Sequence, residues 1–137
     1  WREGAFESLT ASDANQQPMP LDVALSRSVA SISRDLGIRL ILVVSRSGTT
    51  GRVMSSARPA APILAATADR KVCRQLALCW GVLPVPAQVS DFDLPVVLLR
   101  RLADSLDLAD AGQMGLIVRG FRPEPRENQP SVTVVTI

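Results

Sequence analysis

One turn in the middle of the chain gathers side chains that can bind an anion: Ser45, Arg46, Ser47, Gly48, Thr49 and Thr50. Three of these hydroxyl groups, on Ser45, Ser47 and Thr50, can donate hydrogen bonds. Gly48 lets the backbone approach a ligand closely, and Arg46 adds a fixed charge. Because an apolar run precedes the turn and a helical stretch follows it, free N–H groups and the helix dipole can also face a ligand. The turn therefore predicts a phosphate site, with plain capping of the helix as the alternative.

Several other kinds of chemistry are excluded by residue type. The turn is no nucleotide-hydrolysing P-loop, because no lysine follows its second glycine, Gly51. The chain has no histidine, so it cannot build a Ser-His-Asp triad, a Cys-His dyad or a histidine-ligated metal site. The spacing of Asp104, Asp107 and Asp110 favours a solvated helix end over a metal site. We expect neither catalytic nor metal-binding residues in this chain.

Composition indicates one folded domain that is soluble. The 137 residues are 47% hydrophobic and 20% charged, which suits a single packed core. A net charge of +2 gives no electrostatic reason to expect nucleic acid or a membrane as a partner. No apolar run is long enough to span a bilayer, and residues 1–9 do not resemble a signal peptide. Cys73 and Cys79 are expected to be reduced core residues of an intracellular protein.

Short apolar runs alternate with amphipathic stretches along the chain. A helix is predicted over residues 21–37, from apolar residues at steps of three and four and a terminal Gly37. Further helices are predicted over 52–56, 69–80 and 93–106, the last capped by Asp93, and strands over 40–44, 62–66, 82–85, 114–118 and 131–137. This alternation predicts an α/β three-layer sandwich: a five-stranded, mostly parallel sheet, its last strand antiparallel at the edge, with helices on both faces.

The first residues are expected to be a piece of something longer. Residues 1–9 have the pattern of a helix end, and residues 10–20 are polar and contain two prolines, as a linker would. The chain begins at Trp1 rather than Met, as a fragment of a larger protein would. We therefore assign residues 1–20 to the end of a preceding helix and a linker, and residues 21–137 to one domain.

Three motifs in order resemble the C-terminal domain of pyruvate kinases. The first runs from Ile41 to Thr50 and continues through Arg58-Pro59; the others are the stretch from Cys73 to Val82 and the sequence Gly120-Phe121-Arg122-Pro123. The resemblance covers about residues 21–137. It implies a regulatory and tetramer-assembly domain of a cytoplasmic, glycolytic enzyme that transfers a phosphoryl group from phosphoenolpyruvate to ADP. The active site, with its Mg and K ions, would lie in domains that this chain does not contain.

The resemblance also implies particular partners and site residues. A phosphorylated effector would be held by the turn from Ser45 to Thr50, and a later loop with Phe121, Arg122 and Arg126 is a possible effector loop. Other subunits would pair through the last strand of the sheet, near a twofold axis, to make a homo-oligomer. A free-standing module that binds a phosphorylated metabolite is the alternative function.

The later loop departs from the family pattern. It carries Glu124 and Glu127 where many members have a glycine-rich segment. A second departure lies earlier in the chain: Pro95 is near the position of a basic residue that binds a second phosphate in some members. These acidic residues would repel an anion. A sugar bisphosphate is therefore not assured, and a monophosphate, another sugar phosphate or no effector at all remain open.

Overall fold

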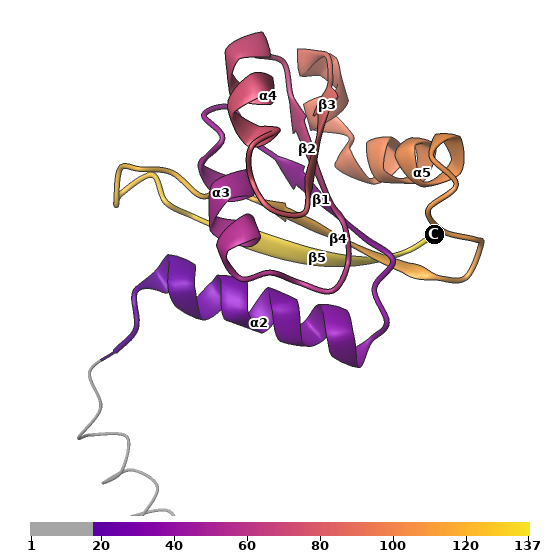
Figure 1. Cartoon of the computed structure of the whole chain (residues 1–137), viewed down its shortest axis with the longest axis horizontal. Coiled ribbons are helices and arrows are strands. Elements are labelled where there is room, and N and C mark those ends of the chain that lie inside the picture. Colours follow the sequence, from indigo (N-terminus) through magenta and orange to yellow (C-terminus); the bar gives the residue numbers. More distant parts are fainter. Residues whose placement is uncertain (1–17) are drawn as a thin grey trace, which may run out of the picture.

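The structure, a computed structural model, describes residues 18–137. The helix end predicted over residues 1–9, and the linker as far as residue 17, lie outside the described residues. Figure 1 shows the order of the elements along the chain. The helices are α2 (Leu21–Asp35), α3 (Thr49–Ser56), α4 (Arg70–Leu76), the 3-10 helix η1 (Val89–Asp93) and α5 (Pro95–Ser105). The strands are β1 (Leu40–Val44), β2 (Ile63–Thr67), β3 (Val82–Pro86), β4 (Met114–Arg119) and β5 (Ser131–Thr136).

The five strands form one sheet in the order β3-β2-β1-β4-β5. Strands β3, β2, β1 and β4 run parallel to one another, and β5 pairs antiparallel with β4. The central strand β1 is apolar throughout because it is covered on both sides, and Leu40 to Val43 are fully buried. This arrangement confirms the predicted mostly parallel sheet with an antiparallel edge strand.

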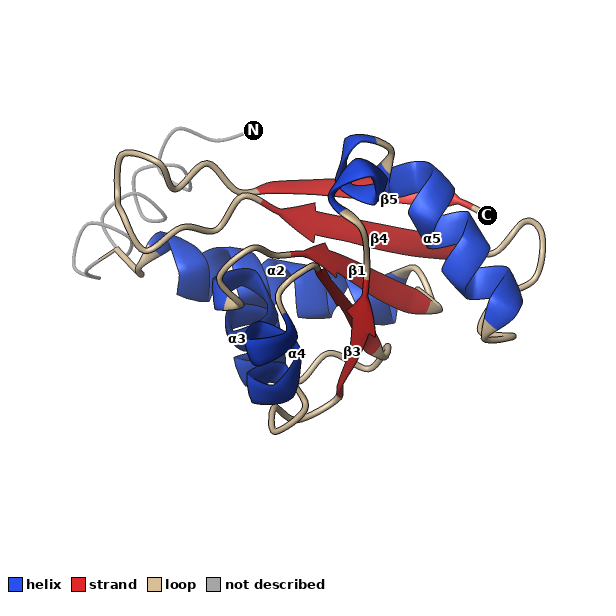
Figure 2. Ribbon diagram, turned by 90° about the horizontal axis from the view of Figure 1, so that it is seen from above, coloured by secondary structure: helices blue, strands red, loops and turns tan. Residues whose placement is uncertain are grey.

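Helices cover both faces of the sheet, as Figure 2 shows from above. Ile41 and Val43 of β1 point to one face, where they pack with Val29 of α2 and Met54 of α3. The short helix α4 packs on the same face through Val72 and Leu76, against Ala65 of β2. The alternate residues of β1, Leu40 and Leu42, point to the other face and pack against α5. The predicted three layers are therefore present.

The two edges of the sheet differ in their backbone donors. Ala87 donates its N–H to the Thr67 carbonyl, so residues 83, 85 and 87 face β2 while Pro84 and Pro86 lie on the free edge. Proline has no N–H, and this edge therefore lacks two donors. At the other edge, Ile137 donates to the Gln113 carbonyl, and alternation along β5 turns the N–H and C=O groups of Val134 away from β4. The β5 edge keeps its hydrogen-bonding groups.

Helix boundaries depart from the predicted ones most clearly in α4 and α3. The helix expected through residue 80 ends at Leu76 and continues as tight turns, such as the bond from Cys79 N–H to the Leu76 carbonyl. These turns bring the chain back to the sheet, where the Gly81 carbonyl accepts a hydrogen bond from the N–H of Ile63 in β2. Conversely, α3 begins at Thr49, three residues before the predicted start.

One predicted residue role is wrong. Asp93 does not cap α5: the capping position is Leu94, and Asp93 instead ends the 3-10 helix η1, which the sequence pattern did not predict. Cys73 and Cys79 are free thiols, as predicted, and both are half-buried; Cys79 packs against the core cluster of Ala65, Val72 and Leu76.

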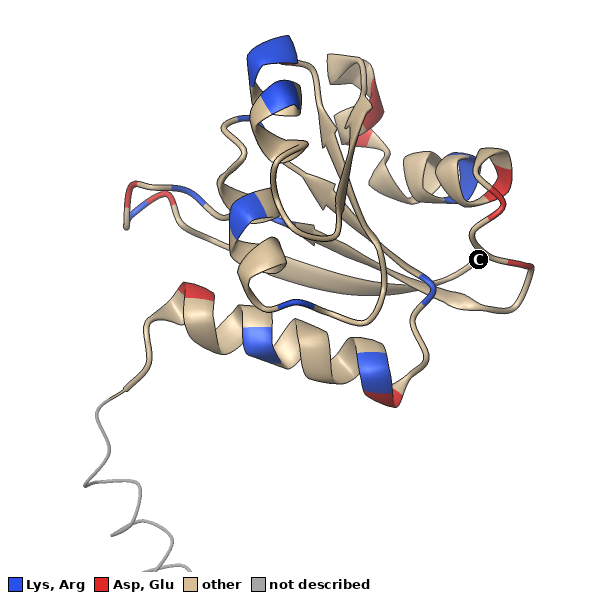
Figure 3. Ribbon diagram, in the orientation of Figure 1, with Lys and Arg blue, Asp and Glu red and all other residues tan. Residues whose placement is uncertain are grey.

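Charged residues are dispersed rather than gathered on one surface. Figure 3 shows both basic and acidic positions distributed over the helices and loops. Asp104, Asp107 and Asp110 are exposed, and within residues 18–137 no three His, Cys, Asp or Glu side chains gather to hold a metal ion. No helix in that same range is both apolar enough and long enough to cross a bilayer.

Candidate functional site

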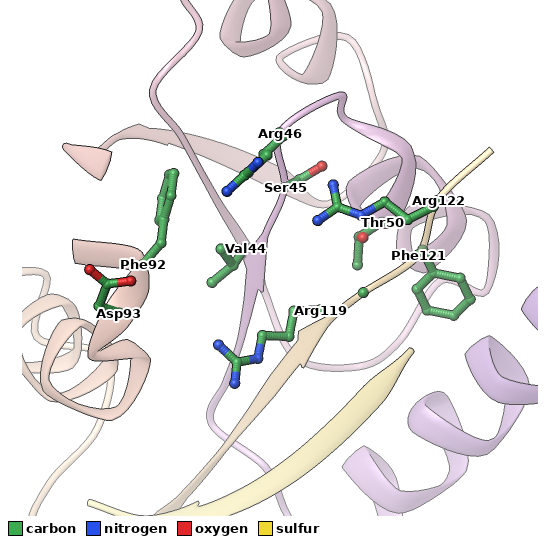
Figure 4. Close-up of a pocket in the computed structure, with 10 residues that line it drawn as sticks. Val44, Ser45, Arg46, Thr50, Phe92, Asp93, Arg119, Phe121 and Arg122 are labelled. Atoms are coloured by element: carbon green, nitrogen blue, oxygen red, sulfur yellow. The ribbon is translucent and has the colours of Figure 1, made fainter. Parts of the chain in front are cut away.

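A cavity of about 240 Å³ lies at the carboxyl ends of β1 and β4. Successive strands β1, β2 and β3 are added on one side of the sheet, and the chain then crosses back through η1 and α5 to place β4 on the other side of β1. The cavity therefore lies where the strand order reverses, the usual ligand position in open α/β sheets. It is lined by Val44, Ser45, Arg46, Thr50, Phe92, Asp93, Arg119, Gly120, Phe121 and Arg122, shown in Figure 4.

Two buried hydroxyl groups face this cavity. The Ser45 Oγ accepts a 2.8 Å hydrogen bond from the N–H of Gly48, which leaves the Ser45 proton free to donate. Thr50 is only 1% exposed, and its hydroxyl makes no hydrogen bond within residues 18–137. In the same range, every side-chain oxygen that is fully enclosed has a hydrogen-bond partner. The Thr50 hydroxyl must therefore open onto the cavity that its residue lines. Both groups can donate to a bound anion.

The amino end of α3 supplies backbone donors beside these hydroxyls. Gly48, with a φ of +84°, occupies the capping position in a left-handed conformation that favours glycine, and no side chain caps the helix. Within the described range, no acceptor is bonded to the N–H groups of Thr49, Thr50 and Gly51. The first turn of a helix leaves such groups free, and together with the helix dipole they attract an anion.

Not every residue of the predicted turn lines the cavity. The hydroxyls of Ser47 and Thr49 bond to each other at 2.8 Å on the exposed side of the turn. The Ser47 carbonyl accepts a 3.2 Å hydrogen bond from the Arg52 guanidinium. Ser47 and Thr49 thus help to hold the shape of the turn, while Ser45, Arg46 and Thr50 border the cavity.

Three arginines and one carboxylate border the cavity. Arg46 follows β1, while Arg119 and Arg122 lie at the end of β4 and just beyond it. Within residues 18–137 the ion pairs are Arg34–Asp35 and Arg101–Asp91, so none of these three guanidinium groups is neutralised by a paired carboxylate. With Asp93 as the one acidic residue in the lining, the cavity carries a local excess of positive charge and suits an anion.

The backbone after β4 fixes the position of Arg122. Gly120 has a φ of +96°, and a Cβ at this position would collide with the backbone carbonyl of Gln129. Gln129 donates its N–H back to the Gly120 carbonyl at 3.1 Å, and Arg122 donates its N–H to the Asn128 side chain at 3.0 Å. These bonds close a loop on itself at the mouth of the cavity, and only glycine permits that closure.

The structure brings together part of the possible effector loop. Phe121 is 3% exposed and packs into the core on the α2 side of the sheet, so it anchors the loop as well as bordering the cavity. Arg122 borders the cavity. Arg126 is exposed, and the cavity lining does not include it. The role suggested for Arg126 stays a prediction.

Among the charged and aromatic residues of the cavity, sequence reasoning missed three as site residues: Phe92, Asp93 and Arg119. Arg119 is the last residue of β4, beside Val44 in the sheet register. A prediction of strand order could have found it, because the ends of neighbouring parallel strands meet at one edge of the sheet. Phe92 and Asp93 lie on η1, whose short sequence carries no clear helical periodicity.

Comparison with known proteins gives a consistent result. The profile of the family described as pyruvate kinase, alpha/beta domain, matches residues 23–134. Pyruvate kinase of Agrobacterium vitis is 31% identical over 129 residues, which are 93% of this chain and 26% of that protein. Pyruvate kinase of Lactobacillus delbrueckii subsp. bulgaricus is 35% identical over 98 residues, 71% of this chain and 17% of the relative. The chain thus spans about a quarter or less of these relatives.

Solved structures agree on the fold. The structure of Cryptosporidium parvum pyruvate kinase in complex with ADP matches with a TM-score of 0.75 and 20% sequence identity, over 98% of this chain and 27% of that one. An identity this low supports the fold alone. The family profile extends over most of the described residues and includes both the turn after β1 and the end of β4. The chain belongs to the pyruvate kinase alpha/beta domain family.

Proposed function

We propose that this chain is the effector-binding and assembly domain of a pyruvate kinase. The observation that carries the proposal is the cavity at the ends of β1 and β4, where two buried hydroxyls, free helix N–H groups and three arginines converge. Plain helix capping would account for the bond from the Gly48 N–H to Ser45, but not for the N–H groups of the first turn of α3, which no side chain caps. A phosphorylated metabolite is the ligand that these donors fit.

The phosphate would lie against the turn after β1. Its oxygens accept hydrogen bonds from the hydroxyls of Ser45 and Thr50 and from the first N–H groups of α3. Arg46 and Arg122 supply charge from the two sides, and a guanidinium can donate two parallel bonds to one phosphate. The binding step needs no proton transfer and no bond cleavage. It is recognition rather than catalysis.

Phosphoryl transfer would belong to other parts of the full protein. In this proposal the whole enzyme transfers a phosphoryl group from phosphoenolpyruvate to ADP in cytoplasmic glycolysis and uses Mg and K ions in its other domains. Residues 18–137 do not fit a site for these metals, because no three acidic or other ligating side chains gather there. This chain would be non-catalytic and would bias the enzyme through ligand binding and subunit contacts.

The free edge of β5 supports the assembly part of the proposal. Val134 is 47% exposed, and its N–H and C=O groups face away from β4. An exposed edge with apolar, β-branched residues is a template for another strand. A second copy of β5, related by a twofold axis, would satisfy both sets of groups, as isologous interfaces do. We propose this contact within a homo-oligomeric pyruvate kinase.

A thermal-shift titration tests the phosphate site. Inorganic phosphate or sulfate should raise the melting temperature of the 137-residue chain by mass action. Arg46→Gln combined with Thr50→Val, which removes the charge and the hydroxyl while keeping side-chain volume, should abolish that rise. Arg39→Gln is the matched control, because Arg39 is an exposed arginine just before the amino end of β1, remote from the cavity. An undiminished rise in the double variant would place the anion elsewhere.

The gene upstream of Trp1 separates this function from that of a free-standing module. An open reading frame that continues for several hundred codons supports a domain of pyruvate kinase. A start codon close to Trp1 supports the module that binds a phosphorylated metabolite and acts through a partner.

A further inference from the structure

The cavity has two chemically different ends. In Figure 4, Ser45, Thr50 and Arg122 lie on one side, Phe92 and Asp93 lie on the other, and Arg46 and Arg119 lie between them. The first end offers hydroxyl and guanidinium donors, whereas the second offers an aromatic ring and a carboxylate acceptor. A ligand that spans the cavity therefore meets donors at one end and a negative charge at the other.

A second phosphate would meet a carboxylate in either direction. Within the cavity itself it would approach Asp93. The neighbouring cavity shares Arg46 and Phe92 with the first and is otherwise bordered by Thr67, Ala68, Asp69 and Val89. There the carboxylate is Asp69, which accepts hydrogen bonds from the first N–H groups of α4 and is therefore held in place. The second space contains no cation other than Arg46, and in the first space the one arginine not assigned to the first phosphate is Arg119, which lies between the two ends.

The size of the first cavity also argues against a second phosphate. Its volume of about 240 Å³ lies below the range of about 300–1,000 Å³ that is usual for pockets of drug-sized ligands. A small phosphate ester fits this space, with its carbon skeleton against the Phe92 ring. The Asp93 carboxylate then accepts hydrogen bonds from hydroxyl groups of the ligand, as acidic residues do for ribose hydroxyls in other α/β proteins.

We infer that the cavity selects a phosphate monoester with an uncharged, hydroxyl-bearing body, and that Asp93 is the residue that rejects a second phosphate. This inference rests on the proposed function of the same site. Asp93 is exposed and, within the described residues, its side chain takes part in no hydrogen bond or ion pair, so its carboxylate is free for the ligand. Arg119, facing the middle of the cavity, then donates to the body of the ligand or to the inner side of its phosphate.

Calorimetric titration of the 137-residue chain at low salt tests the inference. The probes are inorganic phosphate, glucose 6-phosphate and glucose 1,6-bisphosphate, of which the two esters differ by one phosphate. The monophosphate ester should bind more tightly than the bisphosphate. Asp93→Asn should shift the ratio of the two affinities by about tenfold or more toward the bisphosphate, because one close repulsion is removed. Asp104→Asn makes the same charge change at an exposed position of α5 outside the cavity and should leave the ratio unaltered.

Different failures have different meanings. Tighter binding of the bisphosphate by the unaltered chain, or an unchanged ratio in Asp93→Asn, would overturn the role of Asp93 while the phosphate site stands. Binding of inorganic phosphate without either ester would overturn the hydroxyl-bearing ligand. If none of the three probes binds, the proposed phosphate site itself fails, and this inference fails with it.

Discussion

Substitution of Gly120 by alanine should destabilise the domain and weaken anion binding together. At a φ of +96° an alanine is strained, which costs on the order of 1–3 kcal/mol. Its Cβ would also collide with the carbonyl of Gln129, which must move and give up its N–H bond to the Gly120 carbonyl, worth about 1 kcal/mol. We therefore expect the free energy of unfolding to fall by about 3 kcal/mol in total, which lowers the melting temperature of a domain of this size by about 10 °C.

Gly112 provides a matched control for the backbone strain. It has a φ of +90°, and nothing lies within 4 Å of the position that its Cβ would occupy. Gly112→Ala should therefore show the strain alone, on the order of 1–3 kcal/mol. Thermal melts followed by circular dichroism measure both variants. The difference between them isolates the contact between Gly120 and Gln129.

Anion binding distinguishes the two variants further. Movement of Gln129 would open the loop that holds Arg122 through Asn128, so Gly120→Ala should weaken phosphate affinity by several-fold below the melting transition. Gly112→Ala should bind phosphate normally, because Gly112 lies before the start of β4, at the opposite end of the strand from the cavity. Equal destabilisation by both substitutions, with equal phosphate affinity, would refute the reasoning that closure at Gly120 positions Arg122.

Three further outcomes are expected. Val134→Pro removes an N–H from the free edge of β5 and should shift the chain from dimer to monomer in sedimentation velocity. Val134→Ala keeps that N–H and should still dimerise. If the unaltered chain is a monomer, β5 is no autonomous interface. Asp69→Ala removes the cap of α4, which bonds the N–H groups of Lys71 and Val72, and should cost about 1 kcal/mol in chemical denaturation; an unchanged midpoint would contradict a capping role. The 137-residue chain should convert no phosphoenolpyruvate and ADP to pyruvate in a coupled assay, and measurable turnover would mean that catalytic groups are present.

The strands could be predicted because a strand that is buried on both faces is a continuous run of apolar residues. Leu40 to Val44 has no polar residue, and its exposure matches that of a strand at the centre of a parallel sheet. The ends of the helices were harder to predict from the sequence. Nothing in the sequence from Gln75 to Trp80 shows that the helix ends early, whereas the structure places Gly81 against Ile63 of β2, eighteen positions away in the sequence.

The residues of the candidate site differ in the same way: some could be predicted from the local sequence, and others could not. Ser45 and Thr50 were found because the whole turn is contiguous and its residue types reveal their chemistry. Arg119 and Asp93 were not found, since each lies more than forty residues from the turn and comes beside it only through the crossover from β3 to β4. Local pattern identifies a binding turn, whereas the groups that determine its selectivity depend on strand order.

The prolines on the outer side of β3 have a consequence for how copies of this chain can add to one another. The proposed pairing through β5 would join two sheets into one, whose outer margins would be the β3 strands of both copies. Each margin lacks the donors of Pro84 and Pro86, so it offers a poor template for a third copy. Growth would therefore stop at two chains instead of continuing into a filament. A sheet with one receptive margin and one blocked margin limits its own polymerisation.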